Sequence, residues 1–456
     1  MSNPGDTDAT PIASVRQLAE HIAAGCKPPS DYRIGTEHEK FGFDHTTLRP
    51  PAYEPGGIRA LLESMAAPGA WEPILEHGNP IGLKGAGPHH GASVSLEPAG
   101  QFELSGAPLR TLHGTAAEFD AHFAAVRQAA GPLGLGFAPL GHHPTMRRAD
   151  MPWMPKGRYA IMRRYMQLTG QLGLDMMQRT CTVQVNLDYS SEADMARKLR
   201  VSLALQPVAT ALFANSPFIE GQPSGFLSSR ARVWTDTDPD RTGMPALMFA
   251  EDFGFERYVE WLLDVPMYFV SRDGQYKDVA GQSFRTYMAH GLPDLPGARA
   301  TLGDFGDHMT TAFTDVRVKQ FLEMRGADAG RPDMMLAQSA LWVGLLYDDA
   351  ALAAAEALVR RRPWAEYAAL RAAVPRLALG APWQGGTLRD LARDVLMIAR
   401  DGLRARAQPG GPDESQYLAP LEPLVAGAPT QAEHWLERFH GPWRGDAGRI
   451  FAEAAT

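Results

Sequence analysis

Polar and apolar side chains alternate in several segments of this chain, and the alternation predicts strands with one polar face. In the segment 33–43 (RIGTEHEKFGF), Glu37 and Glu39 fall on the same side, because successive side chains of a strand point to opposite faces. The segment 180–188 alternates without interruption and places Gln184 among its polar positions, with an apolar face opposite. Either segment alone could be an ordinary strand with one solvated face.

Two more segments repeat the pattern farther along the chain. SVSLEPAGQFELSG carries Glu97 and Glu103 in one phase, and a bulge is expected at 98–100. VRVKQFLEMRG is expected to form one strand with Glu323 and Arg325 on the same side. Any one of the four could be a half-solvated amphipathic strand, but four at once favour a shared polar face.

The rest of the chain has mainly helical spacing, so the predicted fold class is α+β. We expect a mainly antiparallel sheet with helices packed on its apolar face, which would bring the four polar faces together. Residues 1–30 are expected to hold a tail and a helix, 31–330 a sheet-based core, and 331–456 a helical C-terminal portion. The stretch 219–243 has the composition of a long irregular loop, and Pro207 predicts a kink or break in a helix.

Assembly of the four strands would gather six polar side chains in one concavity. They are Glu37, Glu39, Glu97, Glu103, Gln184 and Glu323. Carboxylates at such close range repel one another unless cations neutralise them or some of them bind protons. Carboxylate and amide oxygens suit Mg²⁺ or Mn²⁺ far better than zinc, so the cluster predicts a divalent metal site.

Composition and charge argue against several other classes of protein. The net charge of −8 disfavours a nucleic-acid binder that relies on a basic surface, and Cys26 and Cys181 are too few for a disulfide framework. The N-terminus is polar and acidic, and no uncharged apolar run reaches the ~18 residues of a membrane span. A cytoplasmic protein is therefore expected. The sequence also lacks the GxxxxGK[ST], GxSxG and HExxH motifs.

Basic and aromatic residues in two loops are candidates for substrate binding. MPKGRY places Lys156 and Arg158 after two prolines, and SRARVWTDTDPDRTG holds Arg232, Trp234 and Arg241. Lysine and arginine side chains on rigid loops suit phosphate or carboxylate groups, although a solvated loop would carry them as well. We expect both loops to border the substrate.

These segments closely resemble one family, the plant-type glutamate–cysteine ligases of plants and many proteobacteria. The resemblance covers residues 30–335 in long, ordered blocks, among them RIGTEHEKFGF, SLEPAGQFELSGAPLRTLH, MPKGRYAIMRRYM, RTCTVQVNLDYS, RVWTDTDPDRTG and VRVKQFLEMRGAD. It implies a fold related to glutamine synthetase, in which a curved antiparallel sheet binds ATP and divalent metals. We expect a single catalytic domain over 1–456, as a monomer or a homodimer.

The resemblance also implies a reaction and a role for each group of candidate residues. The reaction is the ATP-dependent joining of the L-glutamate γ-carboxylate to the L-cysteine amine through a γ-glutamyl phosphate, the first step of glutathione synthesis. The acid and amide cluster, with Glu323, would hold Mg²⁺, and Arg325 would face the nucleotide phosphates, so Arg325 and Glu323 are the expected catalytic residues. The two basic loops would border the substrate pocket. Phosphoryl transfer depends on positioning and charge neutralisation, so no catalytic Ser or Cys is needed. The cysteine pairs that act as a redox switch in plant members have no counterpart here.

Three other functions fit part of the same pattern. A related ligase would consume ATP with glutamate but prefer an amine other than cysteine. A two-metal hydrolase would use the acid cluster on an ester, phosphate or amide without ATP. A catalytically dead relative would retain the fold for binding or regulation, although nothing structural requires six such polar side chains together.

Overall fold

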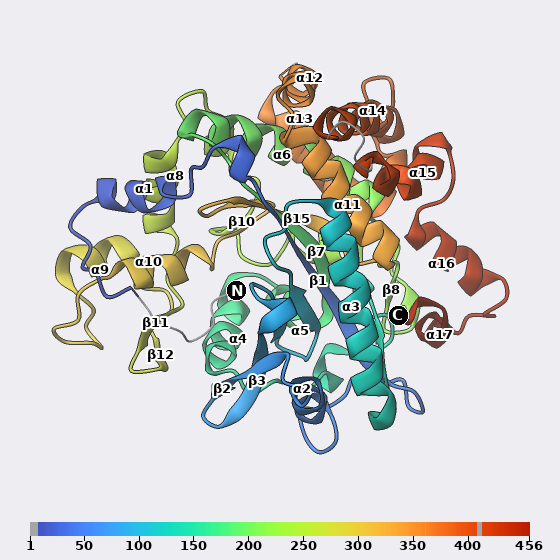
Figure 1. Ribbon diagram of the computed structural model, residues 1–456, viewed down its shortest axis with the longest axis horizontal. Helices are drawn as coiled ribbons and strands as arrows, with labels where there is room; N and C mark the ends of the chain where they lie inside the picture. The colour runs from blue at the N-terminus through green and yellow to red at the C-terminus, as the bar shows by residue number, and fades with distance from the viewer. Residues whose placement is uncertain (1–7, 361, 408–412) are drawn as a thin grey trace.

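The computed structural model describes residues 8–360, 362–407 and 413–456, and its centre is a nine-stranded sheet in which all paired strands are antiparallel (Figure 1). The strands of this sheet are β1 (Ile34–Asp44), β2 (Trp71–Glu76), β3 (Asn79–Gly85), β4 (Ser93–Leu96), β5 (Phe102–Ser105), β6 (Leu135–Ala138), β7 (Thr182–Leu187), β14 (Val316–Val318) and β15 (Leu322–Asp328). Their order is β14-β15-β7-β1-β5-β4-β3-β2, with β6 paired to the far end of β1.

Shorter strand pairs and a large number of helices surround this sheet. The short strands are β8 (Phe218–Ile219), β9 (Gln222–Pro223), β10 (Thr242–Gly243), β11 (Phe269–Arg272), β12 (Gln275–Asp278), β13 (Phe313–Thr314), β16 (Pro382–Trp383) and β17 (Gly386–Thr387). The α-helices are α1 (Val15–Ala23), α2 (Ile58–Ala66), α3 (Leu112–Ala130), α4 (Gly157–Thr169), α5 (Gly173–Arg179), α6 (Glu192–Leu212), α7 (Ser229–Val233), α8 (Phe255–Asp264), α9 (Phe284–His290), α10 (Leu302–Met309), α11 (Pro332–Leu346), α12 (Asp349–Val359), α13 (Trp364–Leu377), α14 (Leu388–Arg406), α15 (Glu422–Ala426), α16 (Gln431–His440) and α17 (Ile450–Ala454). Most of the chain after 331 is helical, as its composition predicts.

Strand β1 organises the sheet because it pairs with three others. Its first half pairs with β7, its middle with β5 and its last residues with β6. The register sets Glu39 opposite Glu103 and Glu37 opposite Gln184. Residues directly opposite in an antiparallel pair project from the same face, so these polar side chains gather on one side of the sheet.

Helices cover the other face of the sheet. Helices α3 and α11 pack on β1, α11 also packs on β7, and α6 packs on β14 and β15 (Figure 1). Cys181, Val183, Val185 and Leu187 are fully buried in the same core as the apolar side chains of α6 and α11. Burial of this apolar surface holds the helices on the sheet. The predicted α+β class, with a mainly antiparallel sheet and helices on its apolar face, is confirmed.

The helix-covered side of β1 is not wholly apolar, which the alternation alone does not reveal. Lys40 is fully buried there, with its Nζ atom 2.8 Å from Nε2 of His122 and donating to the carbonyl of Phe102 at 3.3 Å. His38 is also buried and stacks on Phe123 with 5.0 Å between ring centroids. Burial lowers the pKa of Lys40 to about 7.

The expectation of a bulge at 98–100 is wrong, since this step is the turn of a hairpin between β4 and β5. Within the turn, the backbone N–H of Glu97 donates to the carbonyl of Gln101, and the N–H of Gly100 donates to the carbonyl of Glu97 (both 2.9 Å). Gly100 has a φ of +85°, a backbone conformation that glycine adopts without strain. The hairpin still brings Glu97 to the polar face.

The expectation of one strand over 316–326 is also wrong. Strands β14 and β15 form a hairpin, and Arg317 lies directly opposite Glu323. Alternation within one strand and direct pairing across a hairpin both put these two side chains on one face. The predicted face therefore holds although the predicted strand does not.

Two expectations for the middle of the chain need correction. Pro207 lies inside α6, so the helix is not broken there, and Ser191 caps the start of that helix. The stretch 219–243 is not irregular throughout, because it contains α7 and parts of two strand pairs. Ser228 caps α7 and donates through Oγ to the buried carboxylate of Asp328 at 2.8 Å, which ties this stretch to β15.

Helices α11 and α14 approach each other so closely that two glycines touch. A Cβ atom added to Gly402 would collide with the carbonyl oxygen of Gly344, and one added to Gly344 would collide with the backbone of Ala399. The contact lies in the core that continues to the sheet, since α11 packs on β1 and β7.

Among the described residues, no helix is long and apolar enough to cross a membrane.

Gly402→Ala is expected to lower the free energy of unfolding by about 1–3 kcal/mol, because the added methyl group must push two helix backbones apart. The matched control is Gly306→Ala, also in a helix, where an added Cβ meets nothing within 4 Å. That control should be neutral or slightly stabilising, since alanine favours helices over glycine. Urea denaturation of both variants measures the difference, and equal stabilities would contradict the close contact.

Candidate active site

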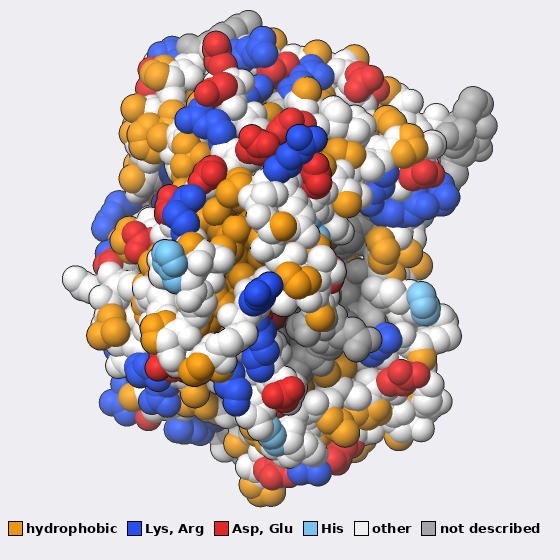
Figure 2. Space-filling view, turned by 90° about the vertical axis from the view of Figure 1, so that its left-hand side faces the viewer, with side chains coloured by type: hydrophobic (Ala, Val, Ile, Leu, Met, Phe, Trp, Pro, Cys, Tyr) orange, Lys and Arg blue, Asp and Glu red, His pale blue; other side chains and the backbone are white. Residues whose placement is uncertain are grey.

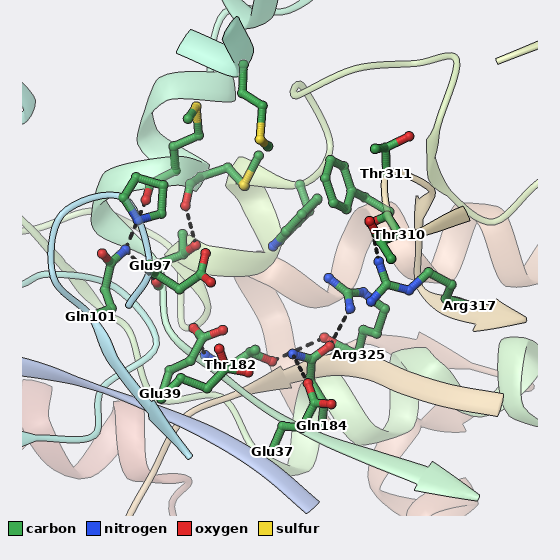
Figure 3. Close-up of a pocket in the computed structure, with 18 of the residues that line it drawn as sticks. Glu37, Glu39, Glu97, Gln101, Thr182, Gln184, Thr310, Thr311, Arg317 and Arg325 are labelled. Atoms are coloured by element: carbon green, nitrogen blue, oxygen red, sulfur yellow. Dashed lines mark hydrogen bonds between the residues drawn. The ribbon is translucent and has the colours of Figure 1, made fainter. Parts of the chain in front are cut away.

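A pocket lies on the polar face of the sheet, where side chains from the strands meet side chains from helices and loops (Figure 3). The strands of the main sheet contribute Glu37, Glu39, Glu103, Thr182, Gln184, Arg317, Glu323 and Arg325. The β4–β5 turn contributes Glu97, Pro98 and Gln101. The remaining wall consists of Arg158, Tyr159, Met162, Met176, Met177, Thr180, Arg230, Trp234, Phe269, Thr310, Thr311 and Phe313. The structure thus brings all six residues of the predicted acid and amide cluster into one pocket.

Three carboxylates form one group within the pocket. Glu39 accepts a hydrogen bond from the backbone N–H of Thr182 (2.9 Å), and Glu103 accepts one from Oγ of Ser95 (2.9 Å). Burial raises the pKa of Glu39 well above its ordinary value, and the nearby charges of Glu97 and Glu103 raise it further. Burial, together with the charges of Glu37 and Glu97, raises the pKa of Glu103 to about 8.

Glu37 interacts with Glu103 through its charge, and it also contacts amide side chains of β7. Nδ2 of Asn186 donates to Oε1 of Glu37 at 2.9 Å, and Nε2 of Gln184 lies 3.5 Å from Oε2. Oε1 of Gln184 accepts a hydrogen bond from Nη1 of Arg325. The amide of Gln184 therefore connects a carboxylate on one side to a guanidinium on the other.

Glu323 is held by two arginines. Arg317 donates to both of its carboxylate oxygens (2.6 and 2.9 Å), and Arg325 donates to Oε1 (2.7 Å). Burial acts against the charged form of Glu323, but Arg317 and Arg325 outweigh it and hold the pKa of Glu323 well below its usual range. In this arrangement Glu323 orients the two guanidinium groups, and its assignment as a metal ligand stays a prediction.

The five residues predicted to bind substrate are separated by the structure. Arg158 and Trp234 line the pocket. Lys156 is buried behind it and donates to the carbonyl of Leu96 at 2.9 Å. Burial, together with the charge of Arg158, lowers the pKa of Lys156 to about 7.

Two more of the five, like Lys156, do not line the pocket. Arg232 is partly exposed and bonds Oγ1 of Thr235 at 2.7 Å. Arg241 is fully buried, pairs with Asp238 at 2.6 Å and stacks over the ring of Tyr268. The contacts of Arg241 are those of a side chain that holds neighbouring loops together, which a count of arginines near an aromatic residue cannot distinguish from a ligand-binding role.

Several lining residues are missing from the sequence prediction. Arg230 lies two residues before Arg232 in the second basic loop, and Arg317 alternates with Glu323 and Arg325 on the polar face of the fourth segment, so a signal for both exists in the sequence. Phe269 and Phe313 come from short strands outside the main sheet, and no pattern in the sequence indicates that they lie near the carboxylates. Tertiary packing alone brings them there.

The donor set of the pocket fits a hard divalent cation. Glu39, Glu97 and Glu103 offer oxygen atoms only. The pKa values of Glu39 and Glu103 are raised because burial and neighbouring carboxylates outweigh the groups that stabilise their charged forms. In the described part of the chain, no group of three or more His, Cys, Asp or Glu side chains is already arranged to hold a metal ion. The residues therefore have suitable ligand atoms for a cation, while their side chains are not already arranged in a coordination geometry.

Comparison with known proteins gives one consistent result. The model of the glutamate-cysteine ligase family 2 matches residues 33–453. A chloroplastic glutamate–cysteine ligase of Arabidopsis thaliana is 51% identical to this chain, and the match covers 98% of this chain and 83% of that protein. A chloroplastic glutamate–cysteine ligase of Brassica juncea is 50% identical, and the match covers 98% of this chain and 85% of that protein. A crystal structure of the glutamate–cysteine ligase of Francisella tularensis with AMP has a TM-score of 0.53, with 13% identity over 92% of this chain and 88% of that one, and supports the fold.

The prediction of a cytoplasmic protein is wrong by the same comparison, because the relatives just named are chloroplastic enzymes. That prediction rests on a polar N-terminus and on the lack of a long apolar run. Neither feature specifies a compartment.

Glu103→Gln is expected to make the stability of the metal-free protein less dependent on pH. Between pH 4.5 and about 8, the folded state keeps a proton on Glu103 that the unfolded state has lost, so the wild-type free energy of unfolding falls as the pH rises. Glutamine resembles the protonated acid and removes this contribution. Urea denaturation with EDTA at pH 5 and pH 8 measures the change for both proteins.

The control for this experiment is Glu72→Gln, which alters an exposed glutamate on β2 and should keep the wild-type dependence. Titrating groups far from Glu103 are common to the three proteins, so they cancel in the comparison. The charge of Glu103 also raises the pKa of Glu39, so its removal is expected to reduce the contribution of Glu39 in the same direction. An identical pH dependence in Glu103→Gln and wild type would show that Glu103 is ionised in the fold at neutral pH.

Proposed function

This chain belongs to the glutamate-cysteine ligase family 2, and from that premise we propose how its pocket carries out the reaction. The protein joins the γ-carboxylate of L-glutamate to the amine of L-cysteine at the expense of ATP, giving γ-glutamylcysteine. The observation that carries the proposal is that one pocket contains both a cluster of carboxylates and a cluster of arginines (Figure 3).

Activation of glutamate is the first requirement, since a carboxylate and an amine do not condense in water unaided. An oxygen of the γ-carboxylate takes the terminal phosphoryl group of ATP, the bond to ADP breaks, and a γ-glutamyl phosphate forms. The cysteine amine then attacks the acyl carbon, phosphate leaves with the bonding electron pair, and the nitrogen loses a proton. No protein nucleophile takes part in either step.

The arginines supply charge neutralisation and position. Arg230 and Arg325 line the pocket, and Nη2 of Arg230 donates to the backbone carbonyl of Arg325 at 2.9 Å, which ties Arg230 to β15. Fixed cations aimed at phosphoryl oxygens stabilise the charge of the transferred group without reorganising during the reaction. Glu323 holds Arg317 and Arg325 in place for that role.

The carboxylates would hold Mg²⁺ or Mn²⁺. We assign Glu39, Glu97 and Glu103 to this role, with Glu37 and Gln184 beside them, because these side chains offer oxygen donors in the same pocket. A bound divalent cation offsets the negative charge of the phosphates. Arg158 and Trp234 border the pocket and are assigned to substrate contact.

The domain organisation, the partners and the oligomeric state of the protein are proposals as well. The packing of α11 on β1 and β7 supports one catalytic domain that includes the helical C-terminal portion. On the face shown in Figure 2, acidic and basic side chains are intermingled over much of the surface, which agrees with small-molecule substrates and no nucleic acid. We keep a monomer or homodimer as the expected state.

The decisive experiment measures ADP release from Mg-ATP with L-glutamate, with and without L-cysteine, and identifies the product by mass. Cysteine-dependent ADP release with the mass of γ-glutamylcysteine supports the proposed reaction. ADP release that depends on a different amine would retain the mechanism and change the acceptor. No ATP consumption with any amine would contradict the proposal and return a hydrolase or an inactive relative to consideration.

Glu37→Gln is expected to reduce turnover by about 100-fold or more while the fold stays intact, because the variant removes a charge from the proposed cation-binding pocket but keeps the shape of the side chain. Steady-state ADP release at low and high Mg²⁺ measures the loss, and circular dichroism checks the fold. Glu72→Gln, on the exposed side of β2, is the matched control and should retain wild-type turnover. Near-normal turnover of Glu37→Gln at low Mg²⁺ would show that Glu37 has no part in cation binding.

A further inference from the structure

The turn that carries Glu97 is fastened to the rest of the protein from outside its own hairpin. The carbonyl of Pro98, inside the turn, accepts a hydrogen bond from the backbone N–H of Met154 at 2.8 Å. The carbonyl of Leu96, the residue just before Glu97, accepts two further hydrogen bonds from side chains of the same neighbouring segment. Glu97 itself is partly exposed and faces the pocket (Figure 3).

Lys156 and Tyr159 are the two side chains that hold Leu96. Nζ of Lys156 donates to the Leu96 carbonyl at 2.9 Å, and the hydroxyl of Tyr159 donates to the same oxygen at 2.5 Å. Lys156 is only 6% exposed and does not line the pocket, so it is placed to act on the turn and not on a substrate. A buried ammonium is costly to maintain, and this one donates its hydrogen bond to the backbone next to a pocket carboxylate.

Gln101 holds the other end of the turn. Its Oε1 accepts from the backbone N–H of Ala99 (2.9 Å), and its Nε2 donates to the carbonyls of Met177 (3.0 Å) and Thr180 (3.2 Å). The side chain is 2% exposed, and all of these partners are backbone groups. Gln101 therefore ties the turn to the end of α5 and the start of the β7 segment.

The turn needs such fastening because of the charges that Glu97 faces. Glu39 and Glu103 lie close enough to Glu97 for their charges to interact, and Glu97 is the one of the three carried by a turn and not by a strand. Like charges push a mobile carboxylate away from its neighbours. Rigid hydrogen bonds to the backbone on both sides of Glu97 oppose that movement.

We propose that Lys156 and Gln101 are positioning residues that hold the 97–101 turn so that Glu97 stays beside Glu39 and Glu103, and that they thereby set the affinity of the pocket for a divalent cation. The inference rests on the proposed metal-binding role of these carboxylates. Side chains that orient metal ligands without touching the metal commonly change affinity by about 10- to 100-fold when they are removed.

The test is the binding of Mn²⁺ to Lys156→Met, followed by electron paramagnetic resonance of free Mn²⁺ in the absence of substrates. We expect binding roughly 10-fold weaker than in the wild type. Loss of the ammonium charge alone would have the opposite effect and strengthen cation binding, so the direction separates positioning from simple electrostatics. Lys84→Met, which alters an exposed lysine on β3 of the same sheet, is the control and should bind Mn²⁺ as the wild type does.

A double-mutant cycle with Glu97→Gln then shows whether Lys156 acts through Glu97. If it does, Lys156→Met should weaken Mn²⁺ binding no further in the Glu97→Gln background. Gln101→Met removes the acceptor for the N–H of Ala99 and the donors to the carbonyls outside the turn, and Tyr159→Phe removes a donor to the Leu96 carbonyl. Both variants are measured in parallel in case Lys156→Met does not fold. Each should weaken binding in the same direction.

Three results would overturn the inference. The first is Mn²⁺ binding by Lys156→Met that is as tight as in the wild type or tighter. The second, if Lys156→Met does not fold, is the same result for both Gln101→Met and Tyr159→Phe. The third is that the effects of Lys156→Met and Glu97→Gln on Mn²⁺ affinity are fully additive. Absence of Mn²⁺ binding by the wild type would instead remove the proposed metal role on which the inference rests. Failure of the ligase itself is recognised separately, because ADP release and product mass are measured without reference to these variants.

Discussion

The antiparallel pairing of β1 with β5 on one side and β7 on the other is the constraint on which the site depends. It sets Glu39 opposite Glu103 and Glu37 opposite Gln184, so one register fixes four polar side chains on one face. A slip of one residue would turn them toward α3 and α11 and expose the apolar side chains of β7 to the pocket. Packing of the helices on the sheet therefore specifies the register, and the register brings the polar side chains of the pocket together.

Placing several carboxylates close together in a buried pocket costs free energy, and the protein compensates some of these carboxylates much more than others. Glu323 is compensated by Arg317 and Arg325, and the pKa of Glu323 is held low as a result. Glu39 and Glu103 receive much less compensation, and their raised pKa values record the deficit. A pocket with satisfied and unsatisfied carboxylates side by side is suited to bind cations at one end and to position guanidinium groups at the other.

Sequence periodicity predicts the faces of this fold better than its connections. The alternation in 180–188 identifies both sides of β7, because one side is buried and the other lines the pocket. The same alternation runs through the β4–β5 and β14–β15 hairpins without revealing their turns, since residues paired across a hairpin share a face as alternate residues of a strand do. The positions of Lys156 and Arg241 outside the pocket have another reason: a basic residue on a loop looks the same in sequence whether it contacts a ligand or holds the backbone.

The pocket lining contains five carboxylates and four guanidinium groups, and Figure 3 shows Glu39 and Glu97 on one side with Arg317 and Arg325 on the other. The pocket is therefore nearly neutral in total but strongly polarised across its width. A polarised cavity selects orientation more than it selects charge. If the pocket binds ATP with a divalent cation as proposed, the nucleotide would have one favourable orientation, with the cation toward the carboxylates and the free phosphoryl oxygens toward the arginines.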